Sequence, residues 1–497
     1  MYIGLFLAFI FVLNIIKCNE YLLSNVTIWG PGLNPDVILP ARYFYVQCNQ
    51  LRFNANDFKV VISGKTKNGN NCRIWTNILD RKDTSFIVRY KLYEVCYDLN
   101  IYIQCIQTNE KLANYFYKGP IYPDECDCSR VPIDTWLSNA QCRTNIDQIN
   151  NDLSQFKEID FNNILDRMVS FFNKNPYSMS ICQYVIKNNL IFRKCYGEYT
   201  GFKMFMDNLL LSLSRKVDLP DLEFFVNLGD WPLSTSKNKF PIFSWCGSKS
   251  TSDIVMPTYD ITESSLENMG RVSLDMLSVQ SNIDKQWSEK IPKAFWMGRD
   301  SSKQRLSLIE ISKQHPDLIN ASITNFFFYK DLKEKYGPGK KPISFFAFFD
   351  YKYQLNLDGT VAAYRFPYLL AGNSLVLKQE SEYYEHFYNE LEPWVHFVPV
   401  KRNLENLVDL IKQMAADDTK AKEISRNGQN YARNNLTPQN ILCYYMLLLQ
   451  NYGKLLTSRV EVRDDMEAVT SPKINSKVVC ECENSENQIK TNLKTEL

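Results

Sequence analysis

Arg365 follows a stretch of the chain that carries almost no side-chain bulk, Gly359–Ala363. Apolar runs at 353–357 and 374–378 flank it and predict buried strands, so the pattern is strand, tight glycine turn, helix and strand. In such a unit the first helix amides point to the carboxyl edge of the sheet, where anions bind. We therefore expect a phosphate to approach the backbone at Thr360, Val361, Ala362, Ala363 and Tyr364, with Arg365 beside it.

The stretch by itself also permits a purely structural interpretation. Every strand–helix unit needs a glycine turn, and an arginine in a first helical turn is commonly exposed to solvent. Pro367 removes a helical hydrogen bond and should shorten or kink the expected helix.

A second turn of the same kind carries two arginines. Apolar residues up to Met297 lead into Gly298-Arg299-Asp300, and Arg305 lies early in the helix that is expected next. Arginine near a helix N-terminus opposes the helix dipole, and a bound anion would account for its presence. Pairing of the arginines with Asp300 or Glu310 is the alternative.

A third turn places a carboxylate at the end of a strand. Residues 224–228 predict a buried strand, and Gly229-Asp230-Trp231-Pro232 leaves it. Shielding from water would raise the affinity of Asp230 for a proton and suit it to act as a general base beside an aromatic wall. An aspartate before Trp-Pro is also a common turn former.

Composition excludes several other chemistries. Only three histidines are present, so a multi-histidine metal site is not expected, and there is neither a Gly-x-Ser-x-Gly elbow nor a Walker loop. With 57 Lys plus Arg against 55 Asp plus Glu, no basic field is available to hold nucleic acid.

The elements that position these turns begin after a region of short strands. Between Asn25 and about Lys118 six or seven strand-like runs predict an immunoglobulin-like sandwich. The runs 86–92 and 99–105 alternate in parity and predict a half-buried antiparallel hairpin. Cys48, Cys72, Cys96 and Cys105 permit three pairings, and 118–128 has the composition of a linker.

The rest of the chain alternates strands with longer helical segments, which predicts a parallel sheet with helices on both faces. The segment Asn440–Tyr452 is apolar enough for a buried helix. From about Thr457 the tail is charged and poor in large apolar residues, apart from Cys480 and Cys482, so we expect much of it to be loosely ordered.

Several features indicate the secretory pathway. Residues 1–18 resemble a signal peptide, although no Lys or Arg precedes the apolar run, and a short membrane anchor is the alternative. Fourteen cysteines suit an oxidising lumen, and removal of Cys18 leaves an odd number, hence at least one free thiol. Asn25-Val-Thr and Asn320-Ala-Ser are glycosylation motifs, and Asn435-Leu-Thr-Pro is a poorer one. The terminal Lys-Thr-Glu-Leu is similar to the endoplasmic reticulum retrieval signal.

The three turns, with "IFSWCG", "DIVMPTYD", "MGRVSLDM", "NFFFYK" and the terminal Lys-Thr-Glu-Leu, resemble the protein O-glucosyltransferases of glycosyltransferase family 90. The subgroup once called KDEL motif-containing proteins is the most similar. The first domain resembles its filamin-type repeat in "WGPGL", "LPARYFYVQ" and "LDRKDTSFIVRYKLY". The resemblance extends from Asn25 to about Tyr452.

The resemblance implies a GT-B fold of two Rossmann-like halves that works without a metal on UDP-glucose, with UDP-xylose as a second donor. The acceptor would be a serine of an EGF-like repeat, as in Notch-type receptors, and the anomeric carbon would be inverted. Asp230 matches the catalytic base of the family. Arg299, Arg305 and Thr360–Arg365 match positions that hold the nucleotide sugar. A fold-retaining but inactive binding protein for EGF-repeat clients is the alternative.

The resemblance also organises the chain. It implies a signal peptide at 1–18, a filamin-type domain at 19–123, a glycosyltransferase domain at 124–456 and a charged tail at 457–497 that a retrieval receptor binds. Cys126, Cys128, Cys142 and Cys443 match cysteines that tie the start of the catalytic region to its last helix. Cys182 and Cys195 flank an expected hairpin and are candidates for a pair.

Overall fold

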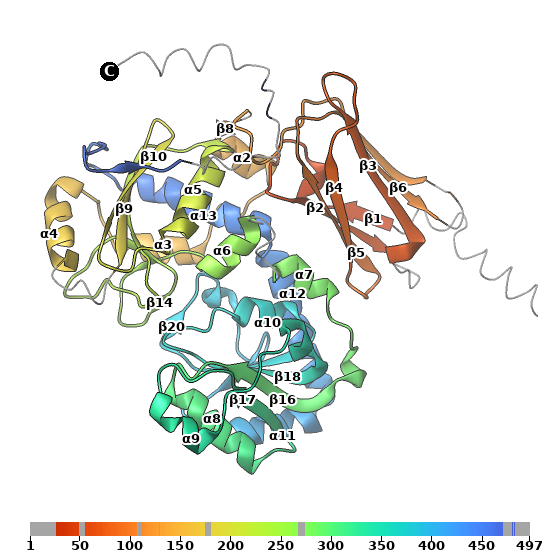
Figure 1. Cartoon of the computed structure of the whole chain (residues 1–497), viewed down its shortest axis with the longest axis vertical. Coiled ribbons are helices and arrows are strands. Elements are labelled where there is room, and N and C mark those ends of the chain that lie inside the picture. Colours follow the sequence, from red (N-terminus) through yellow and green to blue (C-terminus); the bar gives the residue numbers. More distant parts are fainter. Residues whose placement is uncertain are drawn as a thin grey trace, which may run out of the picture. The chain divides into compact units, whose positions relative to one another are not determined.

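The computed structural model describes residues 26–48, 55–106, 109, 111–128, 130–173, 180–266, 274–470, 480 and 482 (Figure 1). The expected signal peptide, the Asn25 motif and the terminal Lys-Thr-Glu-Leu lie outside these residues. The chain forms two compact units. Unit 1 holds residues 1–141, 214–218 and 471–497, and unit 2 holds 142–213 and 219–470.

Unit 1 contains a β-sandwich. A four-stranded sheet in the order β1-β2-β5-β4 faces a three-stranded sheet in the order β3-β6-β7, and all pairs are antiparallel. The strands are β1 (Val26–Trp29), β2 (Arg42–Cys48), β3 (Phe58–Lys65), β4 (Ile74–Asp80), β5 (Ser85–Leu92), β6 (Tyr97–Cys105) and β7 (Lys111–Tyr117).

The hairpin expected from 86–92 and 99–105 is wrong. Strand β5 pairs with β2 and β4, whereas β6 pairs with β3 and β7 in the opposite sheet. The alternation itself is real, because Phe86, Val88 and Tyr90 of β5 share one core with Leu99 and Ile101 of β6. Two neighbouring runs that each bury one face satisfy the same pattern whether they pair or pack face to face.

Disulfides close unit 1 at two places. Cys72 pairs with Cys96 inside the sandwich, and Cys105 is disulfide-bonded as well. Cys126 pairs with Cys480 and Cys128 with Cys482. These two disulfides tie the C-terminal segment to the residues that directly follow the β-sandwich. The partners of Cys126 and Cys128 are therefore tail cysteines, and not Cys443.

The first half of unit 2 is a six-stranded mixed sheet in the order β15-β13-β12-β9-β10-β22. Its strands are β9 (Ile181–Lys187), β10 (Leu190–Tyr196), β12 (Leu222–Asn227), β13 (Ile242–Ser244), β15 (Ile254–Val255) and β22 (Glu467–Ala468). Strands β12, β13 and β15 are parallel, whereas β9, β10 and β22 are antiparallel, so the expectation of a parallel sheet holds for only part of it.

All six residues of β12 are buried because helices cover both faces of the sheet. Successive side chains point to opposite faces. Phe224 lies against Tyr452 of α13 (Pro438–Gly453), with ring centroids 6.3 Å apart, and Phe225 stacks on Phe161 of α4 (Phe161–Asn173) at 6.1 Å. Helix α13 is the buried apolar helix that the sequence predicts.

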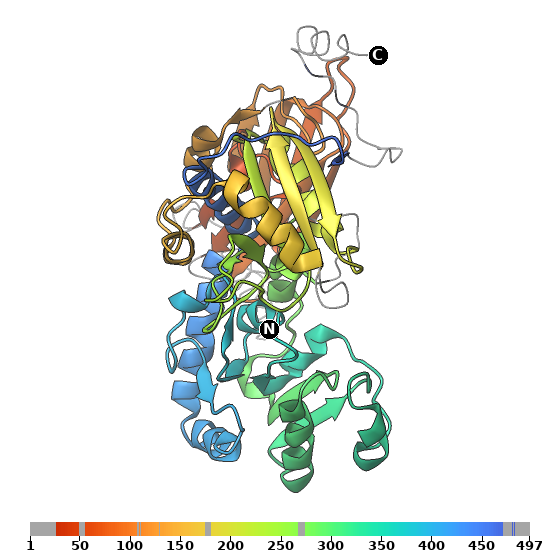
Figure 2. The same cartoon turned by 90° about the vertical axis from the view of Figure 1, so that its left-hand side faces the viewer.

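The tail is more ordered than expected up to residue 470. Strand β22 pairs with β10 at the sheet edge, where the dark-blue segment lies beside the yellow strands (Figure 2). Arg463 and Asp465 contribute ion pairs to Glu223 and Lys194. A low content of apolar residues did not predict the order of this segment, because ion pairs and one strand pairing hold it.

The second half of unit 2 is a parallel five-stranded sheet in the order β17-β16-β18-β19-β21. Its strands are β16 (Ile291–Gly298), β17 (Ile319–Ile323), β18 (Tyr351–Asn356), β19 (Leu375–Gln379) and β21 (Val398–Val400). Helices α8 (Lys303–Gln314) and α11 (Leu407–Ala416) lie on one side, and α10 (Phe366–Ala371) lies on the other (Figure 1).

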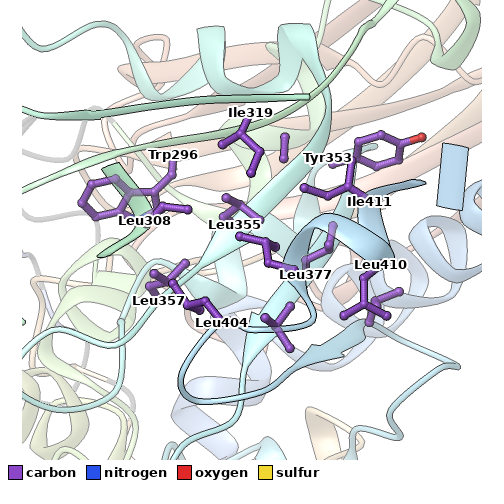
Figure 3. Close-up of a cluster of buried hydrophobic side chains, with 14 of the residues drawn as sticks. Trp296, Leu308, Ile319, Tyr353, Leu355, Leu357, Leu377, Leu404, Leu410 and Ile411 are labelled. Atoms are coloured by element: carbon purple, nitrogen blue, oxygen red, sulfur yellow. The ribbon is translucent and has the colours of Figure 1, made fainter. Parts of the chain in front are cut away.

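Alternate residues of these strands fill one apolar cluster. Trp296, Tyr353, Leu355 and Leu377 from the sheet meet Leu308 of α8 and Ile411 of α11 (Figure 3). The spacing Leu407, Ile411 and Met414 places one face of α11 in this cluster, as its sequence predicts.

The remaining elements of the described chain connect these layers. They are β8 (Val131–Pro132), β11 (Val217–Asp218), β14 (Gly247–Ser248), β20 (Tyr383–Tyr384), α2 (Ile133–Asn139), α3 (Asp147–Leu153), α5 (Lys203–Ser214), α6 (Tyr259–Leu266), α7 (Met276–Ser281), α9 (Lys333–Tyr336), α12 (Asp418–Asn435) and the short 3-10 helices η2 (Pro31–Leu33), η3 (Ala55–Asp57), η4 (Trp287–Glu289), η5 (Lys330–Leu332), η6 (Phe345–Asp350) and η7 (Tyr388–Glu390). Within the described ranges, no helix combines the length and apolar character that crossing a bilayer requires.

Two disulfides of unit 2 differ mainly in the length of chain that they close. Cys142–Cys443 joins residues 301 apart in sequence, and Cys182–Cys195 joins residues 13 apart across the β9–β10 hairpin. Both pairings agree with the sequence interpretation. Cys246 is the free and buried thiol among the described cysteines, in agreement with the odd count.

Removal of Cys142–Cys443 by the double substitution Cys142→Ser and Cys443→Ser is expected to lower the free energy of unfolding by about 5 to 6 kcal/mol, because the disulfide joins residues 301 apart. In the chain-entropy model, removal of Cys182–Cys195 costs only about 3 kcal/mol, because the closed loop is short. Urea unfolding of both variants would measure the difference. An equal or larger loss for Cys182→Ser with Cys195→Ser would contradict the loop-length argument.

Candidate active site

Three loops that follow strands of unit 2 carry the residues that the sequence singles out. One loop leaves β12 of the six-stranded sheet, and the other two leave β16 and β18 of the five-stranded sheet. Carboxyl ends of parallel strands are where α/β proteins place ligands. The question is which of these side chains the fold brings together.

The turn that carries Asp230 is held by Asn227, the last residue of β12. Asn227 Nδ2 donates to Trp231 O at 2.6 Å and to Ser244 Oγ at 3.1 Å, and its Oδ1 accepts from Gly229 N at 2.9 Å. One buried amide thus braces both sides of Asp230. The position of the carboxylate is fixed by the backbone that carries it.

A second buried group, Asp253, holds the remainder of the turn. Its carboxylate accepts from the amides of Leu233 and Ser234, each at 2.8 Å, and from Ser244 Oγ at 2.6 Å. Burial raises the pKa of Asp253 to about 6, although these three hydrogen bonds act in the opposite direction. Asp253 is committed to structure and leaves Asp230 as the half-buried carboxylate of this turn.

Asp230 has the electrostatics of a general base. Removal of water from around the carboxylate raises its pKa above the usual 3.8. The neighbouring Trp231 is 53% exposed, so it does not form the aromatic wall expected from the sequence. Tyr259 and Tyr364 are closer candidates, since burial and then the charge of Asp230 raise the pKa of both phenols.

Tyr364 and Tyr259 join the two halves of unit 2 at this point. Their ring centroids lie 5.5 Å apart at 86°, and Tyr259 also lies 5.7 Å from Trp245 and stacks on Phe205 at 5.1 Å. The Cys246 thiol donates to Asp230 O at 3.3 Å, and the Tyr364 side chain lies close to the same thiol. The loop after β18 is thereby placed beside Asp230.

The loop after β18 differs from the expected helix start. Helix α10 begins at Phe366, so Thr360 to Tyr364 form an irregular segment and their amides are not in its first turn. Val361, Ala362 and Ala363 are buried, with 3%, 5% and 6% of their surface exposed. Gly359 N donates to Val361 O at 2.9 Å, which makes the tight turn that the sequence predicts.

The later helix start also accounts for Pro367. Arg365 is the N-cap residue and Pro367 lies in the first turn of α10, where a backbone N–H has no helical acceptor. The proline therefore does not interrupt a helix. It sets where α10 starts.

Arg365 lies against the backbone of the neighbouring strand. Its Nη1 donates to Met297 O at 2.7 Å, and a Cβ at Gly298 would lie only 3.2 Å from its Nη2, so a glycine leaves the space that the guanidinium uses. Burial lowers the pKa of Arg365 to about 10, and the carboxylate of Asp260 on α6 opposes this change. Arg365 stays cationic at neutral pH between the two halves.

The Arg305 side chain is buried and hydrogen-bonded to the protein itself, which a ligand-binding arginine does not require. The side chain is 6% exposed and donates to the backbone oxygens of Leu357 and Asp358, to Arg299 O and to Ser301 Oγ. Burial, and then the nearby Arg365, lower its pKa to about 9. Arg305 joins the loop after β16 to the loop after β18.

Arg299 is exposed and lies in the same loop as the buried Asp300. Asp300 accepts from the amides of Phe327, Phe328 and Tyr329 at 2.6 to 3.2 Å. The alternative, an ion pair of an arginine with Asp300 or Glu310, is not observed, because Asp300 binds backbone amides and Glu310 binds Lys335 and Tyr336. Arg299 therefore adds a solvent-facing cation on a fixed loop.

The structure thus brings Tyr364 close to Asp230 and Arg365 close to Asp260, and places Arg299 within electrostatic range of Tyr259. Sequence reasoning missed Asn227, Asp253, Tyr259, Asp260 and Cys246. Asp253, Tyr259 and Asp260 stand in the motif "DIVMPTYD" and Cys246 stands in "IFSWCG", both noted without a role, and Asn227 ends the strand before the turn of Asp230. In the described part of the chain no group of three acids, histidines or cysteines is arranged to hold a metal.

Comparisons with known proteins test the family resemblance. The model of glycosyl transferase family 90 matches residues 137–495. The chain is 47% identical over 460 residues to Protein O-glucosyltransferase 2 of Danio rerio, with 90% of this chain and 91% of the relative covered. It is 45% identical over 471 residues to Protein O-glucosyltransferase 3 of Homo sapiens, covering 92% of each.

Two solved structures superpose weakly. Anabaena HepE in complex with UDP-glucose has a TM-score of 0.28 and 9% identity, covering 44% of this chain and 64% of that chain. TarM has a TM-score of 0.29 and 10% identity over 82% of this chain and 74% of that chain. Scores of this size do not establish a shared fold, whereas the family model and the sequence identities do establish a family: this chain belongs to glycosyl transferase family 90.

Proposed function

We propose that the chain is a protein O-glucosyltransferase that moves glucose from UDP-glucose to a serine hydroxyl of an EGF-like repeat. The observation that carries the proposal is the placement of Asp230, whose pKa is raised, beside the loop of Tyr364 and Arg365 from the other half of unit 2. The family and the names of the relatives support the same reaction. UDP-xylose is proposed as a second donor.

Asp230 would remove the proton from the acceptor serine while the serine oxygen attacks the anomeric carbon. The bond from that carbon to the UDP oxygen breaks on the opposite face, so the configuration is inverted. Because Asn227 and Asp253 hold the turn, the carboxylate needs no reorganisation before it accepts the proton. Removal of water raises its pKa, which strengthens it as a base.

The leaving diphosphate would be bound by cations and amides. Arg365 and Arg299 supply charge, and the small buried residues Val361, Ala362 and Ala363 keep side chains away from the backbone of their loop. Such preorganised donors can stabilise the charge that develops on UDP without a metal ion. Arg305 would act by holding both loops in register.

The acceptor surface would begin at Trp231, which follows Asp230 directly and is 53% exposed. An exposed aromatic side chain beside a catalytic carboxylate is a natural contact for a folded protein substrate. EGF-like repeats of secreted or membrane receptors such as Notch are the proposed acceptors.

We further assign the architecture and the compartment. The two sheets of unit 2 support a GT-B fold, and the orders β1-β2-β5-β4 and β3-β6-β7 correspond to the two sheets of an immunoglobulin-like domain, here of filamin type. We keep 19–123, 124–456 and 457–497 as the filamin-type domain, transferase domain and tail. The disulfides support an oxidising lumen. We place the protein in the endoplasmic reticulum, retained through its terminal Lys-Thr-Glu-Leu.

The substitution Asp230→Asn is expected to lower the rate of transfer by about 10²- to 10⁴-fold, because the amide cannot accept the serine proton. Affinity for UDP should be unchanged, since Asp230 contacts the acceptor. The gain of one hexose on a folded EGF-like repeat, followed by mass spectrometry, measures transfer. Asp166→Asn, an exposed aspartate of α4, is the matched control. Full activity of the Asp230 variant would assign the base to another residue, and an inactive wild type would favour a binding protein.

The pH dependence of kcat/KM should show the raised pKa of Asp230. Only the ionised carboxylate accepts a proton, so activity is present above its pKa and falls as the pH decreases through it. The acid limb is therefore expected above 3.8, the usual value for an aspartate. Rates measured from pH 4 to 8 in the same hexose assay, at subsaturating acceptor, test this prediction. A kcat/KM that does not decrease as the pH is lowered to 4 would count against it.

The substitution Arg299→Ala is expected to weaken UDP binding by about 1.5 to 3 kcal/mol, the contribution of a charge-assisted hydrogen bond. Arg299→Lys keeps the charge but cannot form two parallel hydrogen bonds, so it should lose less affinity for UDP than Arg299→Ala does. Calorimetric titration with UDP measures both variants. Lys303→Ala, an exposed residue of the next helix, serves as control, and an unchanged Kd for Arg299→Ala would remove Arg299 from the donor site.

A further inference from the structure

A groove of about 540 Å3 runs along the outer edge of the five-stranded sheet, away from the loops described above. Edge strand β17 forms its floor, and walls come from α8, from the segment after α9 and from Tyr351. Its volume is within the range of about 300 to 1,000 Å3 that ligand sites occupy.

The edge of β17 is not open to another strand. Ser312 Oγ donates to Ile319 O and accepts from Ala321 N, each at 3.1 Å, and Lys340 N donates to Ile323 O at 2.8 Å. These bonds occupy the edge positions at which an added strand would pair. An occupant of the groove must therefore be held through side chains.

The floor of the groove carries the motif Asn320-Ala321-Ser322. Asn320 and Ser322 are two residues apart on β17 and so point to the same face of the sheet. Asn320 Nδ2 donates to the Tyr351 hydroxyl at 2.7 Å. Ser322 is 5% exposed, and within the described part of the chain its hydroxyl has no hydrogen-bond partner.

We propose that Asn320 carries an N-linked glycan whose first sugars lie in this groove. The inference rests on the lumenal location in the proposed function. In the reaction, Nδ2 forms a bond to C1 of an oligosaccharide carried on a lipid diphosphate, loses one proton, and the bond from C1 to the diphosphate oxygen breaks.

The chemistry of the groove suits this occupant. Nδ2 has two hydrogens, so a substituted Asn320 keeps one to donate to Tyr351. Tyr336 and Tyr351 offer apolar ring faces with a polar tip, and Lys293, Lys313 and Lys340 offer donors for sugar hydroxyls. The Ser322 hydroxyl is required while the chain is still unfolded, which accounts for a buried hydroxyl that has no partner afterwards.

Asn435 provides an internal contrast. Its Nδ2 donates to Tyr431 O at 3.0 Å, and the third residue of its motif, Thr437, caps α13 through the amide of Asn440. The cavity that Asn435 lines measures about 20 Å3, which is room for about one water molecule. Of these two asparagines, only Asn320 lines a cavity that is large enough for a sugar.

The test uses the full chain, made in cells with a secretory pathway and carrying Asn25→Gln so that the first motif is silent. Peptide mapping by mass spectrometry should find the glycan on Asn320. Ser322→Ala should abolish it, whereas Ser322→Thr, which keeps the motif, should retain it. An endoglycosidase that cuts between the first two sugars should release the glycan from denatured protein much faster than from native protein.

Asn320 without glycan in a protein that is disulfide-bonded and transfers glucose would overturn the inference and leave the proposed function intact. Absence of both glycan and disulfides would overturn it together with the lumenal location. A glycan on Asn320 that is released equally fast from native and denatured protein would overturn its placement in the groove.

Discussion

A single buried cation, Arg305, holds together the part of unit 2 on which the site depends. Its guanidinium is bound by oxygens of both loops that follow β16 and β18. Taking such a charge out of water is costly, and it is tolerated here because several of its N–H groups meet oxygen acceptors. Without it the carbonyl of Leu357 would lose this donor, and the carbonyl of Asp358 would keep only the bond from Ser302 Oγ.

Buried acids and amides hold other loops of unit 2 in the way that Arg305 holds the loops after β16 and β18. Asn227 and Asp253 bind the turn of Asp230, as Asp300 binds the loop of Phe327 to Tyr329. These groups sit beneath the reacting residues and never need to touch a substrate. The half-buried Asp230 and the exposed Arg299, to which we assign functional roles, lie on loops whose supporting polar groups are already hydrogen-bonded.

The sequence predicted much of the fold and identified the three loops of the site. Buried strands, the apolar helix α13 and the glycine turn at Gly359 all follow from local patterns. The pairing of strands could not be predicted, as β5 and β6 demonstrate. Alternation of apolar and polar residues indicates that a strand buries one face, but it does not indicate which strand lies beside it. The start of α10 was misplaced by several residues, since glycine and small residues permit either a helix or a turn.

The roles of the candidate residues were harder to predict from the sequence than their positions in the fold. Arg299 and Arg305 look alike in sequence, yet one faces solvent and the other bonds to backbone oxygens, and only the tertiary structure distinguishes them. Tyr259 and Cys246 join the site through contacts between distant segments, which a single sequence does not display. Whether each candidate binds the donor stays a prediction.

The long-range disulfides have a consequence for the fate of the molecule. Cys126–Cys480, Cys128–Cys482 and Cys142–Cys443 turn most of the chain into covalent rings. A protease that cuts one loop within a ring produces no separate fragment, so damage would be visible only after reduction. For the same reason the chain cannot be threaded end-first through a narrow channel for disposal until a reductant has opened the rings.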